Sequence, residues 1–433
     1  MRLYSFVKLL EKDGMLEKIS SPVSVTYECA YWLKRFDGNK AVIFENPVGY
    51  EMPVVGNILC NRKMLYTALA VRNDEEAFLK MLQALNNPHS LRVEGMPSCF
   101  KPIEDLNLLP VLRSYEGEAG PYITSGIIIA RELAGEVLNA SVHRLMVVDR
   151  KHLAIRIVPR HLYIMFNKAR KMGKPLPVLI VIGAPPEVYI ASAASPPYGV
   201  FELEVANSLS GGSLHVFETR NGLFAPIESE IIILGKLLTD VEVPEGPFVD
   251  LTGTLDEIRN QPIIEVEEIL ARRDAVYYSI LQGGREHMLL MGFPREVAIW
   301  DSVRKVVPSV RSVRLIEGGC GWLTAAISIN KSVDGDAKNA ILAAFAAHPS
   351  LKIAIVVDED INIDDPNDLL WAISTRMQPD EDLIILKGMR GSSLDPSANQ
   401  LTLETSKLGI DATIPLTKKR EGFLRARIPY SSS

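Results

Sequence analysis

The pattern of apolar and polar positions changes twice along the chain, which predicts three regions. In the first region, short helical patterns alternate with short strand-like ones. The segment that begins at Asp74 has acids in its first turn before an apolar run, which predicts the start of a helix. Residues 102–110 are bounded by prolines and predict a connector. Residues 1–110 are therefore expected to form an N-terminal α/β domain.

In the second region, from about residue 120, strand-like segments dominate. One clear helix is predicted over residues 163–172. The segments rich in β-branched and other apolar residues are 123–130, 141–148, 153–158, 178–182 and 212–217. Many strands with few helices are typical of a β-barrel or a β-sandwich. We expect this domain to cover residues 111–300.

In the third region, residues 301–433, predicted strands alternate with predicted helices. Strands are predicted over 323–329, 353–357 and 383–386, and a helix over 337–347. The run 353–357 is fully apolar, as in a strand buried on both faces. Asp365 and Pro366 predict the start of a further helix, with proline at its first position. This alternation indicates a C-terminal α/β domain.

Composition narrows the class of protein. The 433 residues exceed what one ordinary core holds, and 47% hydrophobic with 23% charged residues is a globular composition. The net charge of -6 argues against a nucleic-acid partner. The N-terminus is amphipathic rather than an apolar signal, and no charge-free stretch is long enough for a membrane span, so we expect a cytoplasmic protein. The four cysteines are far apart, which argues against a thiolate zinc site or a disulfide framework.

The predicted strand around residue 141 carries several side chains that can bind anions or metals. On a strand, Asn139, Ser141 and His143 would share one face. Arg144 and Arg156 would lie close together if residues 149–151 close a hairpin. Arginine and histidine side chains in such a group can bind phosphate through charge-assisted hydrogen bonds. A charged strand face exposed to solvent would give the same pattern.

Two further motifs contain candidate acids. Glu230 precedes the apolar run 231–234 and is either a cap or a metal ligand, since Asn, His and Glu together suit Mg²⁺ or Mn²⁺. Glu286 and His287 follow Gly283-Gly284 and could transfer protons, or could lie in a polar hairpin loop. The acidic stretch 358–365 lacks the glycine and the glutamate of an EF-hand, and we interpret its acids as helix caps.

Taken together and in this order, four stretches resemble the UbiD family of decarboxylases. Residues 357–379, VDEDINIDDPNDLLWAISTRMQP, are similar to the family's acidic turn and the helix that follows it. Residues 244–253, PEGPFVDLTG, resemble its PEGPFGDHTG motif, with Val249 and Leu251 in place of the usual Gly and His. Residues 406–413, SKLGIDAT, and residues 139–144, NASVHR, resemble two further family motifs.

The resemblance implies a fold and a cofactor. The fold is an N-terminal α/β domain, a central split β-barrel like that of flavin reductases and a C-terminal α/β domain. The cofactor is prenylated FMN, held through Mn²⁺ or Mg²⁺ and with K⁺ as a further cation. The metal ligands implied are Asn139, His161 and Glu230. The cofactor-contacting residues implied are Val142, His143, Arg144, Arg156, Ile157, Val158 and Arg160, with Lys407 reaching the phosphate.

The resemblance also implies the reaction, a non-oxidative decarboxylation of an α,β-unsaturated acid. The cofactor is needed as an electron sink, which protein side chains are not. Glu286 is expected to protonate the product carbon, and Arg144 to orient the substrate carboxylate. His287 competes for the role of the acid, and Glu228 and Asp250 are the next residues to consider.

The substrate expected first is trans-anhydromevalonate 5-phosphate, which would give isopentenyl phosphate for isoprenoid biosynthesis, because a compact branch of the family carries out that step. The alternative substrate is an aromatic acid such as a 4-hydroxybenzoate derivative. A non-catalytic flavin-binding protein is the alternative of another class. The resemblance further implies a flavin prenyltransferase as supplier of the cofactor, and a homo-oligomer, either a dimer or a hexamer.

Overall fold

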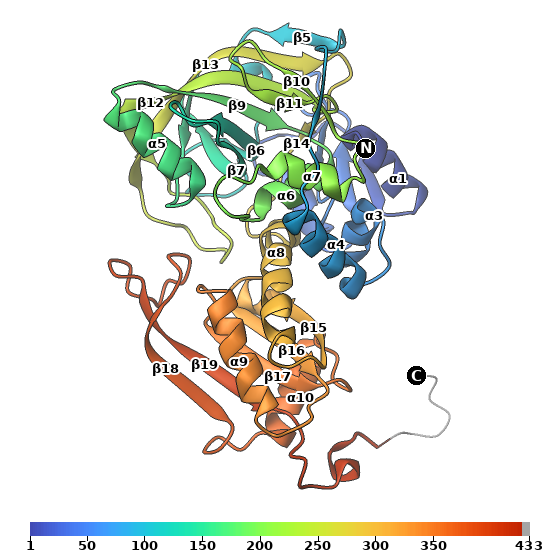
Figure 1. Ribbon diagram of the computed structural model, residues 1–433. Coiled ribbons are helices and arrows are strands. Elements are labelled where there is room, and N and C mark those ends of the chain that lie inside the picture. Colours follow the sequence, from blue (N-terminus) through green and yellow to red (C-terminus); the bar gives the residue numbers. More distant parts are fainter. Residues whose placement is uncertain (427–433) are drawn as a thin grey trace. The chain divides into compact units, whose positions relative to one another are not determined.

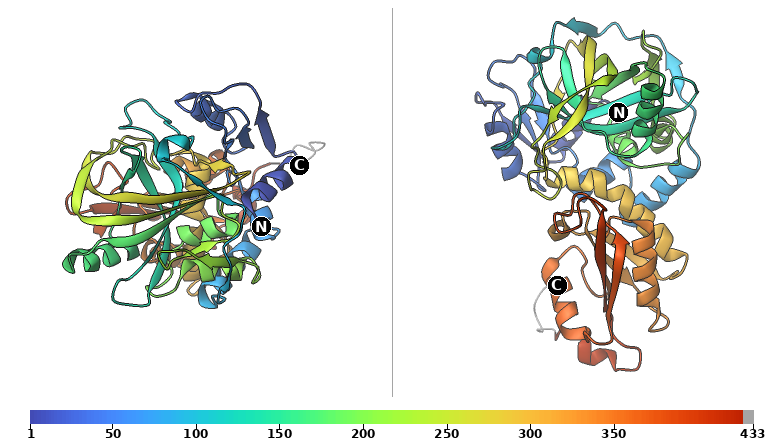
Figure 2. Two further views of the ribbon diagram at one scale, coloured as in Figure 1. Left: turned by 90° about the horizontal axis from the view of Figure 1, so that it is seen from above. Right: turned by 90° about the vertical axis from the view of Figure 1, so that its left-hand side faces the viewer.

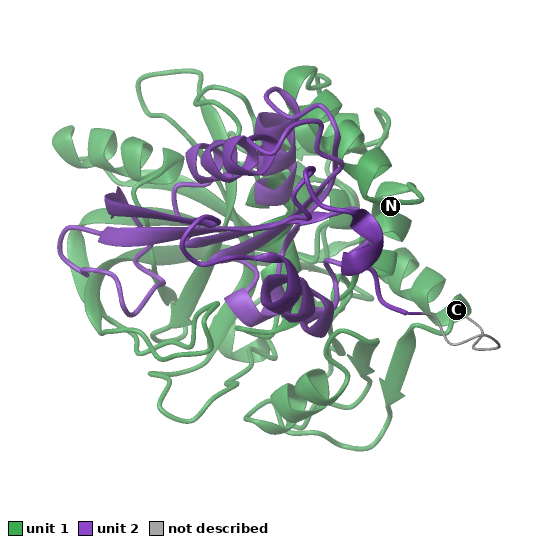
Figure 3. Ribbon diagram, turned by 90° about the horizontal axis from the view of Figure 1, so that it is seen from below, with its two compact units in different colours: residues 1–294 green, residues 295–433 purple. Residues whose placement is uncertain are grey.

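The computed structural model describes residues 1–426, and the chain divides into two units, residues 1–294 and residues 295–433 (Figure 3). No helix among the described residues is both long and apolar enough to cross a membrane. Helix α8 (Arg285–Arg304) begins in the first unit and ends in the second. The boundary expected near residue 110 stays a prediction.

The first unit opens with a small four-stranded sheet of order β1-β2-β3-β14. Its last strand comes from far along the chain and pairs in parallel with β3. The strands are β1 (Leu16–Ile19), β2 (Ala41–Phe44), β3 (Val54–Gly56) and β14 (Tyr277–Tyr278). The helices of this region are α1 (Leu3–Lys12), α2 (Glu28–Arg35), α3 (Arg62–Leu69) and α4 (Asp74–Asn86). The side chain of Asn73 caps α4, whose acidic first turn the sequence predicted.

A closed barrel of six strands forms the middle of the first unit (Figures 1 and 2). Going around it, the strands are β12 (Ile231–Glu245), β9 (Leu176–Ile182), β6 (Tyr122–Arg131), β7 (Leu138–Val147), β8 (His152–Ile155) and β13 (Arg259–Arg272). Pairing of β12 with β13 closes the ring, and every neighbouring pair is antiparallel. This is the mixed α/β fold with a central barrel that the sequence predicted.

Helices and short strands surround the barrel. Helix α5 (His161–Lys171) contacts β6, β7, β9 and β12, so β9 is buried on both faces, as its nearly continuous apolar sequence requires. Helices α6 (Pro186–Ala193) and α7 (Glu202–Leu209) pack against β7. The remaining elements are β4 (Arg92–Glu94), β10 (His215–Glu218) and β11 (Phe224–Pro226), which form a small sheet, the edge strand β5 (Phe100–Ile103), and the 3-10 turn η1 (Leu106–Leu108).

The second unit is an α/β layer built on a five-stranded sheet of order β15-β16-β17-β19-β18. Strands β16, β17 and β19 are parallel, and the outer strands are antiparallel to their neighbours. The strands are β15 (Val310–Leu315), β16 (Thr324–Ile329), β17 (Ile353–Asp358), β18 (Leu383–Arg390) and β19 (Glu404–Ala412). The helices are α9 (Asp336–Ala347) and α10 (Pro366–Arg376), with short 3-10 turns η2 (Glu317–Gly319) and η3 (Arg420–Phe423).

Most predicted elements are found within a few residues of their predicted limits. The side chain of Asp365 caps α10, and Pro366 is its first residue, as expected. The segment 102–110 was predicted as a connector only, and this is wrong in part. It contains the end of β5, which pairs with β13, and the turn η1. All four cysteines are free.

Candidate active site

Strand β7 places three polar side chains in a row on one face. The Ser141 hydroxyl lies 3.0 Å from Asn139 Oδ1 and 2.9 Å from His143 Nε2. His143 Nδ1 lies 3.0 Å from the carbonyl oxygen of Arg156, across the predicted hairpin. Burial lowers the pKa of His143 to about 4, so the ring is neutral and donates from Nδ1 to that carbonyl. The shared face and the hairpin are both confirmed.

Asn139 and His161 meet at a carboxylate that the sequence reasoning missed, Glu202. Asn139 Nδ2 donates to Glu202 Oε1 at 2.8 Å, and the backbone N–H of Ala140 donates to Glu202 Oε2 at 2.6 Å. His161 Nδ1 lies 3.8 Å from Glu202 Oε1. Three elements supply the group, since Asn139 is on β7 while His161 and Glu202 are the first residues of α5 and α7.

This group suits a divalent cation. Glu202 is 2% exposed, and in the part of the chain that the structure describes no lysine or arginine pairs with its carboxylate. A buried carboxylate without a positive partner is costly, and a bound cation removes that cost. A carboxylate oxygen, an amide oxygen and an imidazole nitrogen are suitable ligands for Mn²⁺ and Mg²⁺. With a metal bound, the Asn139 amide would turn its oxygen toward the ion.

The structure does not bring Glu230, the third predicted metal ligand, to this group. Its carboxylate accepts two hydrogen bonds from Arg2, at 2.7 and 2.8 Å, and one from Val276 N–H at 3.3 Å. Its backbone pairs with the end of β9 at Ile182, whereas Asn139 lies beyond β6 opposite Val178. Those two positions on β9 are about 13 Å apart at 3.3 Å per residue. Glu230 therefore holds the N-terminus and cannot share an ion with Asn139.

Arg144 stands at the centre of a second group, formed with carboxylates from the end of β12 and the loop that follows it. Its Nε and Nη2 atoms donate to the two oxygens of Glu245 at 3.0 and 2.9 Å. Nη2 also donates to Asp256 at 2.7 Å, and Nη1 donates to Asp250 at 3.2 Å. Burial disfavours the charged guanidinium, but Glu245 and the two aspartates outweigh it and raise the pKa of Arg144.

Aromatic rings fix the position of this guanidinium. The Arg144 guanidinium lies 4.4 Å from the centre of the Phe248 ring, and the Phe248 ring lies 4.7 Å from that of Tyr122. Glu245 is fully buried, whereas the Asp250 side chain is 22% exposed. Arg144 is therefore anchored by Glu245 on one side and reachable beside Asp250 on the other.

His287 completes this second group. The backbone N–H of Gly283 donates to His287 Nδ1 at 3.2 Å, so the neutral ring carries its proton on Nε2. Burial lowers the pKa of His287, and the Asp250 carboxylate and the Arg144 guanidinium act on it in opposite directions. Asp250 and Arg144 are therefore the charged groups that act on this imidazole. Residues 285–304 form helix α8 and not the hairpin loop that was considered.

Glu286, predicted as the proton donor, faces another part of the unit. It is fully buried, and its carboxylate accepts hydrogen bonds from the backbone N–H groups of Asn57 at 2.9 Å and Leu59 at 2.7 Å. Burial raises its pKa to about 7, a value suited to an acid at neutral pH. Neighbouring residues on a helix point in different directions, so His287 faces the Arg144 group while Glu286 does not. Its catalytic role stays a prediction.

The other predicted cofactor contacts follow β7 and β8. Val142 is on β7, and Arg156, Ile157 and Val158 lie just after β8. Burial and the neighbouring guanidiniums of Arg259 and Arg144 lower the pKa of Arg156. A bound anion would offset both the burial of this guanidinium and its repulsion by the two neighbouring ones. Arg160 precedes α5, and its Nη1 donates to Ser195 Oγ at 2.8 Å.

Lys407, predicted to reach the cofactor phosphate, belongs to the second unit. Its ammonium donates to the carbonyl oxygens of Pro349 at 2.7 Å and Leu351 at 2.5 Å. Burial lowers the pKa of Lys407 to about 8. These contacts hold the end of β19 against the turn before β17, and a phosphate contact stays a prediction.

Family models match almost the whole chain. The 3-octaprenyl-4-hydroxybenzoate carboxy-lyase N-terminal domain matches residues 7–85. The Rift-related domain of the same enzymes matches residues 94–285, and their C-terminal domain matches residues 288–412.

Curated relatives and solved structures agree with these models. The chain is 42% identical to the anhydromevalonate phosphate decarboxylase of Aeropyrum pernix over 98% of this chain and 96% of that one. It is 45% identical to the enzyme of the same name from Methanocaldococcus jannaschii, over 92% and 94%. The UbiD-class enzyme HmfF from Pelotomaculum thermopropionicum, solved with FMN, aligns with a TM-score of 0.95 at 38% identity, covering 99% of this chain and 98% of that one.

Proposed function

Because the chain belongs to the UbiD family of decarboxylases, we propose that it converts trans-anhydromevalonate 5-phosphate to isopentenyl phosphate with prenylated FMN as cofactor. The relatives of that name support the substrate, and the HmfF complexes with FMN and prFMN support the cofactor. The observation that carries the proposal is the Arg144 group, a buried guanidinium that remains reachable at one edge.

Arg144 binds the substrate carboxylate in this proposal. Its bond to Asp250, at 3.2 Å, is longer than its bonds to Glu245 and Asp256, and Nη1 has a second N–H to offer. A substrate carboxylate can therefore take up Nη1 while Glu245 keeps Nε and Nη2 in place. The pairing is bidentate on the Glu245 side, which fixes the direction in which Nη1 points.

Asp250 is the proton donor for the product carbon in this proposal. A substrate carboxylate that shares Nη1 with Asp250 lies beside the Asp250 carboxyl group, which positions that group near the reacting carbon. After CO₂ leaves, an Asp250 oxygen delivers the proton to the product carbon. Neutral His287, with its proton on Nε2, is buried and is influenced by the charge of Asp250.

Asn139, His161 and Glu202 would hold the divalent metal, Mn²⁺ or Mg²⁺, and through it the cofactor phosphate, with Arg156 near the same anion. A prenylated flavin held there would supply the electron sink that a decarboxylation needs. Glu202 replaces Glu230 in the ligand set that the sequence suggested. A flavin prenyltransferase is the proposed supplier of the cofactor.

A substrate panel tests the proposal. The enzyme, co-produced with a flavin prenyltransferase and supplied with Mn²⁺, is incubated with trans-anhydromevalonate 5-phosphate, its dephosphorylated analogue and 4-hydroxybenzoate, and CO₂ is measured. We expect release from the phosphorylated acid and little from the others. Faster release from 4-hydroxybenzoate would favour the aromatic-acid alternative. A flavin spectrum without release from any acid would favour a non-catalytic flavin-binding protein.

The proposal includes self-association. Strand β18 is at the edge of the sheet in the second unit, and Ile385 on it is 63% exposed. An unpaired edge with an exposed apolar side chain readily pairs with another strand. Light scattering at micromolar concentration should give a dimer or a larger species, and a monomer of 48 kDa would contradict this part of the proposal.

A further inference from the structure

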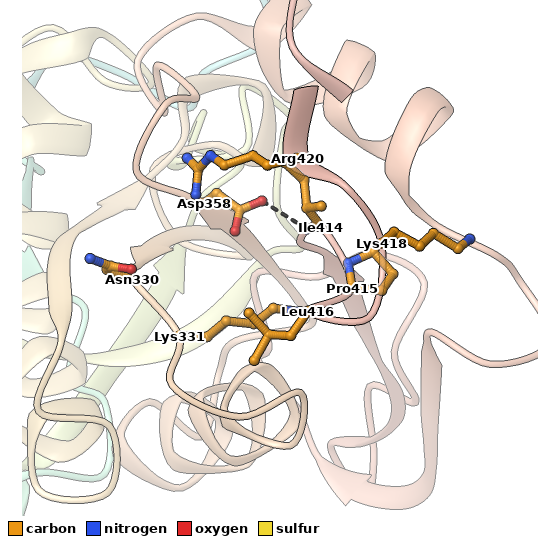
Figure 4. A pocket seen from close by; sticks show the side chains of 8 residues that line it. All are labelled: Asn330, Lys331, Asp358, Ile414, Pro415, Leu416, Lys418 and Arg420. Carbon is orange, nitrogen blue, oxygen red and sulfur yellow. Dashed lines mark hydrogen bonds between the residues drawn. The ribbon is translucent and has the colours of Figure 1, made fainter. Parts of the chain in front are cut away.

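The second unit contains a cavity at the carboxyl ends of its parallel strands. Asn330 and Lys331 follow β16, and Asp358 ends β17. The remaining lining residues follow β19 and are Ile414, Pro415, Leu416, Lys418 and Arg420 (Figure 4). The cavity, counted to its open mouth, has a volume of about 510 Å³. The family model of the C-terminal domain ends at residue 412. The third wall of this cavity, formed by the lining residues after β19, therefore lies beyond the matched segment.

The topology of the sheet explains why a cavity forms there. An added Cβ at Gly409 would meet Ile341 of α9, so α9 covers the face to which Gly409 points. Ile410 packs with Leu369 and Ala372 of α10. Neighbouring strand residues point to opposite faces, so α9 and α10 cover opposite faces of the sheet. The chain therefore passes from β16 and from β17 to opposite faces of the sheet. The cavity lies outside the carboxyl ends of these strands, where open α/β sheets bind ligands.

The lining favours an anion. It contains three cationic side chains, Lys331, Lys418 and Arg420, and one carboxylate, Asp358. Asp358 is 4% exposed, and it is neutralised from behind by Arg376, whose Nη1 donates to it at 2.8 Å. The N–H of Ile414 also donates to Asp358 at 2.8 Å, which ties the third wall to the end of β17 (Figure 4).

Lys331 and Arg420 both have donors left for a ligand, and Lys331 is also held in position. Lys331 Nζ donates to Asp334 and to Thr413 Oγ1, both at 2.8 Å, which leaves a third donor on the ammonium. Arg420 reaches over Asp358 in Figure 4, and its hydrogen bond to Asp360 is long at 3.4 Å. Its side chain is 47% exposed, so most of its donors are available to a ligand.

The rest of the lining is apolar. Ile414, Pro415 and Leu416 form one wall beside the cations, and Leu416 is 53% exposed. A cationic rim next to a short apolar wall matches a molecule with a phosphate at one end and a few carbon atoms at the other.

We propose that this cavity is a second ligand site, which binds a small phosphate ester with a short hydrocarbon chain. Arg420 and Lys331 hold the phosphate, and Leu416 contacts the hydrocarbon. The site lies wholly within the second unit, whereas the metal group and the Arg144 group belong to the first. The proposal does not depend on which acid the enzyme decarboxylates.

The test is hydrogen–deuterium exchange of the flavin-loaded enzyme titrated with n-butyl phosphate. Protection is expected in peptides that cover residues 324–336 and 410–424, and the concentration at half-maximal protection gives the local affinity. Arg420→Ala should raise that concentration at least tenfold. The matched control is Lys419→Ala, which removes the same charge from a neighbouring residue outside the cavity and should change it less than twofold.

A second variant tests the apolar wall. Leu416→Ser should weaken binding of n-butyl phosphate while binding of inorganic phosphate is unchanged. The proposal is overturned if the ester protects neither segment of the unaltered enzyme, or if Arg420→Ala and Lys419→Ala bind it equally well. If Leu416→Ser weakens the binding of n-butyl phosphate and of inorganic phosphate by the same factor, the proposed hydrocarbon contact is wrong.

Discussion

Arg376 and Arg144 both face carboxylates, but they differ in how far their side chains are enclosed. Arg376 on α10 is fully buried, and its Nη atoms donate to Asp358 at 2.8 Å and to Asp360 at 2.6 and 3.1 Å. Arg144 is 9% exposed and ends beside the partly exposed Asp250. The Arg376 group links α10 to the end of β17, whereas the Arg144 group has a partly exposed side at which a substrate can bind. The most family-specific stretch, residues 357–379, thus contains a structural link.

The largest effect on stability is expected where the arginine is fully enclosed. Arg376→Met leaves Asp358 buried without its cation, which should lower the free energy of unfolding by about 3–5 kcal/mol. Decarboxylation per folded, flavin-loaded molecule should be unchanged, because no residue of the Arg144 group is altered. Urea unfolding followed by fluorescence, together with kcat at low temperature, measures both quantities.

The matched control is Arg425→Met, since Arg425 also contacts side chains of α10. Arg425 pairs with Asp368 at 2.8 Å and packs over Trp371, but its side chain is 56% exposed. An exposed pair contributes at most about 1 kcal/mol. Equal losses of stability for the two variants would show that the Arg376 group is not the link described above.

Glu286 extends the comparison to a buried carboxylate that accepts hydrogen bonds from two backbone N–H groups. Burial raises its pKa from 4.5 to about 7. Between these values the unfolded chain has released the proton and the folded chain retains it, so stability falls as pH rises, by about 1.4 kcal/mol per pH unit. In Glu286→Gln this loss between pH 4.5 and 7 should disappear. Parallel stability curves for variant and parent would contradict the assignment.

Much of the fold follows from local patterns. The apolar run of β17 and the Asp365-Pro366 start of α10 are decided by their own residues, and the structure places both as predicted. Likewise, the alternation of Asn139, Ser141 and His143 fixed their common face. By contrast, the strand within 102–110 exists because it pairs with β13, a partner far along the chain.

The same limit applies to the site. The acid before the buried run was either a cap or a ligand by its pattern, and the family resemblance implied a ligand. The partner of Glu230 is instead Arg2, 228 residues away. Glu202 resembled an ordinary acid at a helix start, and only the packing of α7 against β7 brings it to Asn139. Glu245 and Asp250, two partners of Arg144, lie in the motif 244–253. The sequence showed the motif but not that these carboxylates bind Arg144.

The smallest effect on stability, and a clear one on metal content, is expected at Glu202. Glu202→Gln should weaken Mn²⁺ binding by at least about 10–100-fold, because the only carboxylate of the group is lost. Glu230→Gln is the control, since Glu230 contacts Arg2 instead. Metal analysis and flavin absorbance after desalting should show loss in the first variant and retention in the second. Loss in Glu230→Gln with retention in Glu202→Gln would restore the ligand set first inferred from the sequence.

The central claim is that catalysis belongs to the Arg144 group, with Asp250 as the proton donor. The most direct measurement compares kcat of flavin-loaded Asp250→Asn and Glu286→Gln on trans-anhydromevalonate 5-phosphate, each with its flavin spectrum as a check of the cofactor. Asn cannot supply a proton, so Asp250→Asn should lose about 10²–10⁴-fold in kcat with its cofactor retained. Glu286→Gln, whose carboxylate faces Asn57 and Leu59, should stay within about tenfold of the parent. Loss of turnover in Glu286→Gln, with Asp250→Asn near the parent rate, would contradict the claim and return the role of the acid to Glu286.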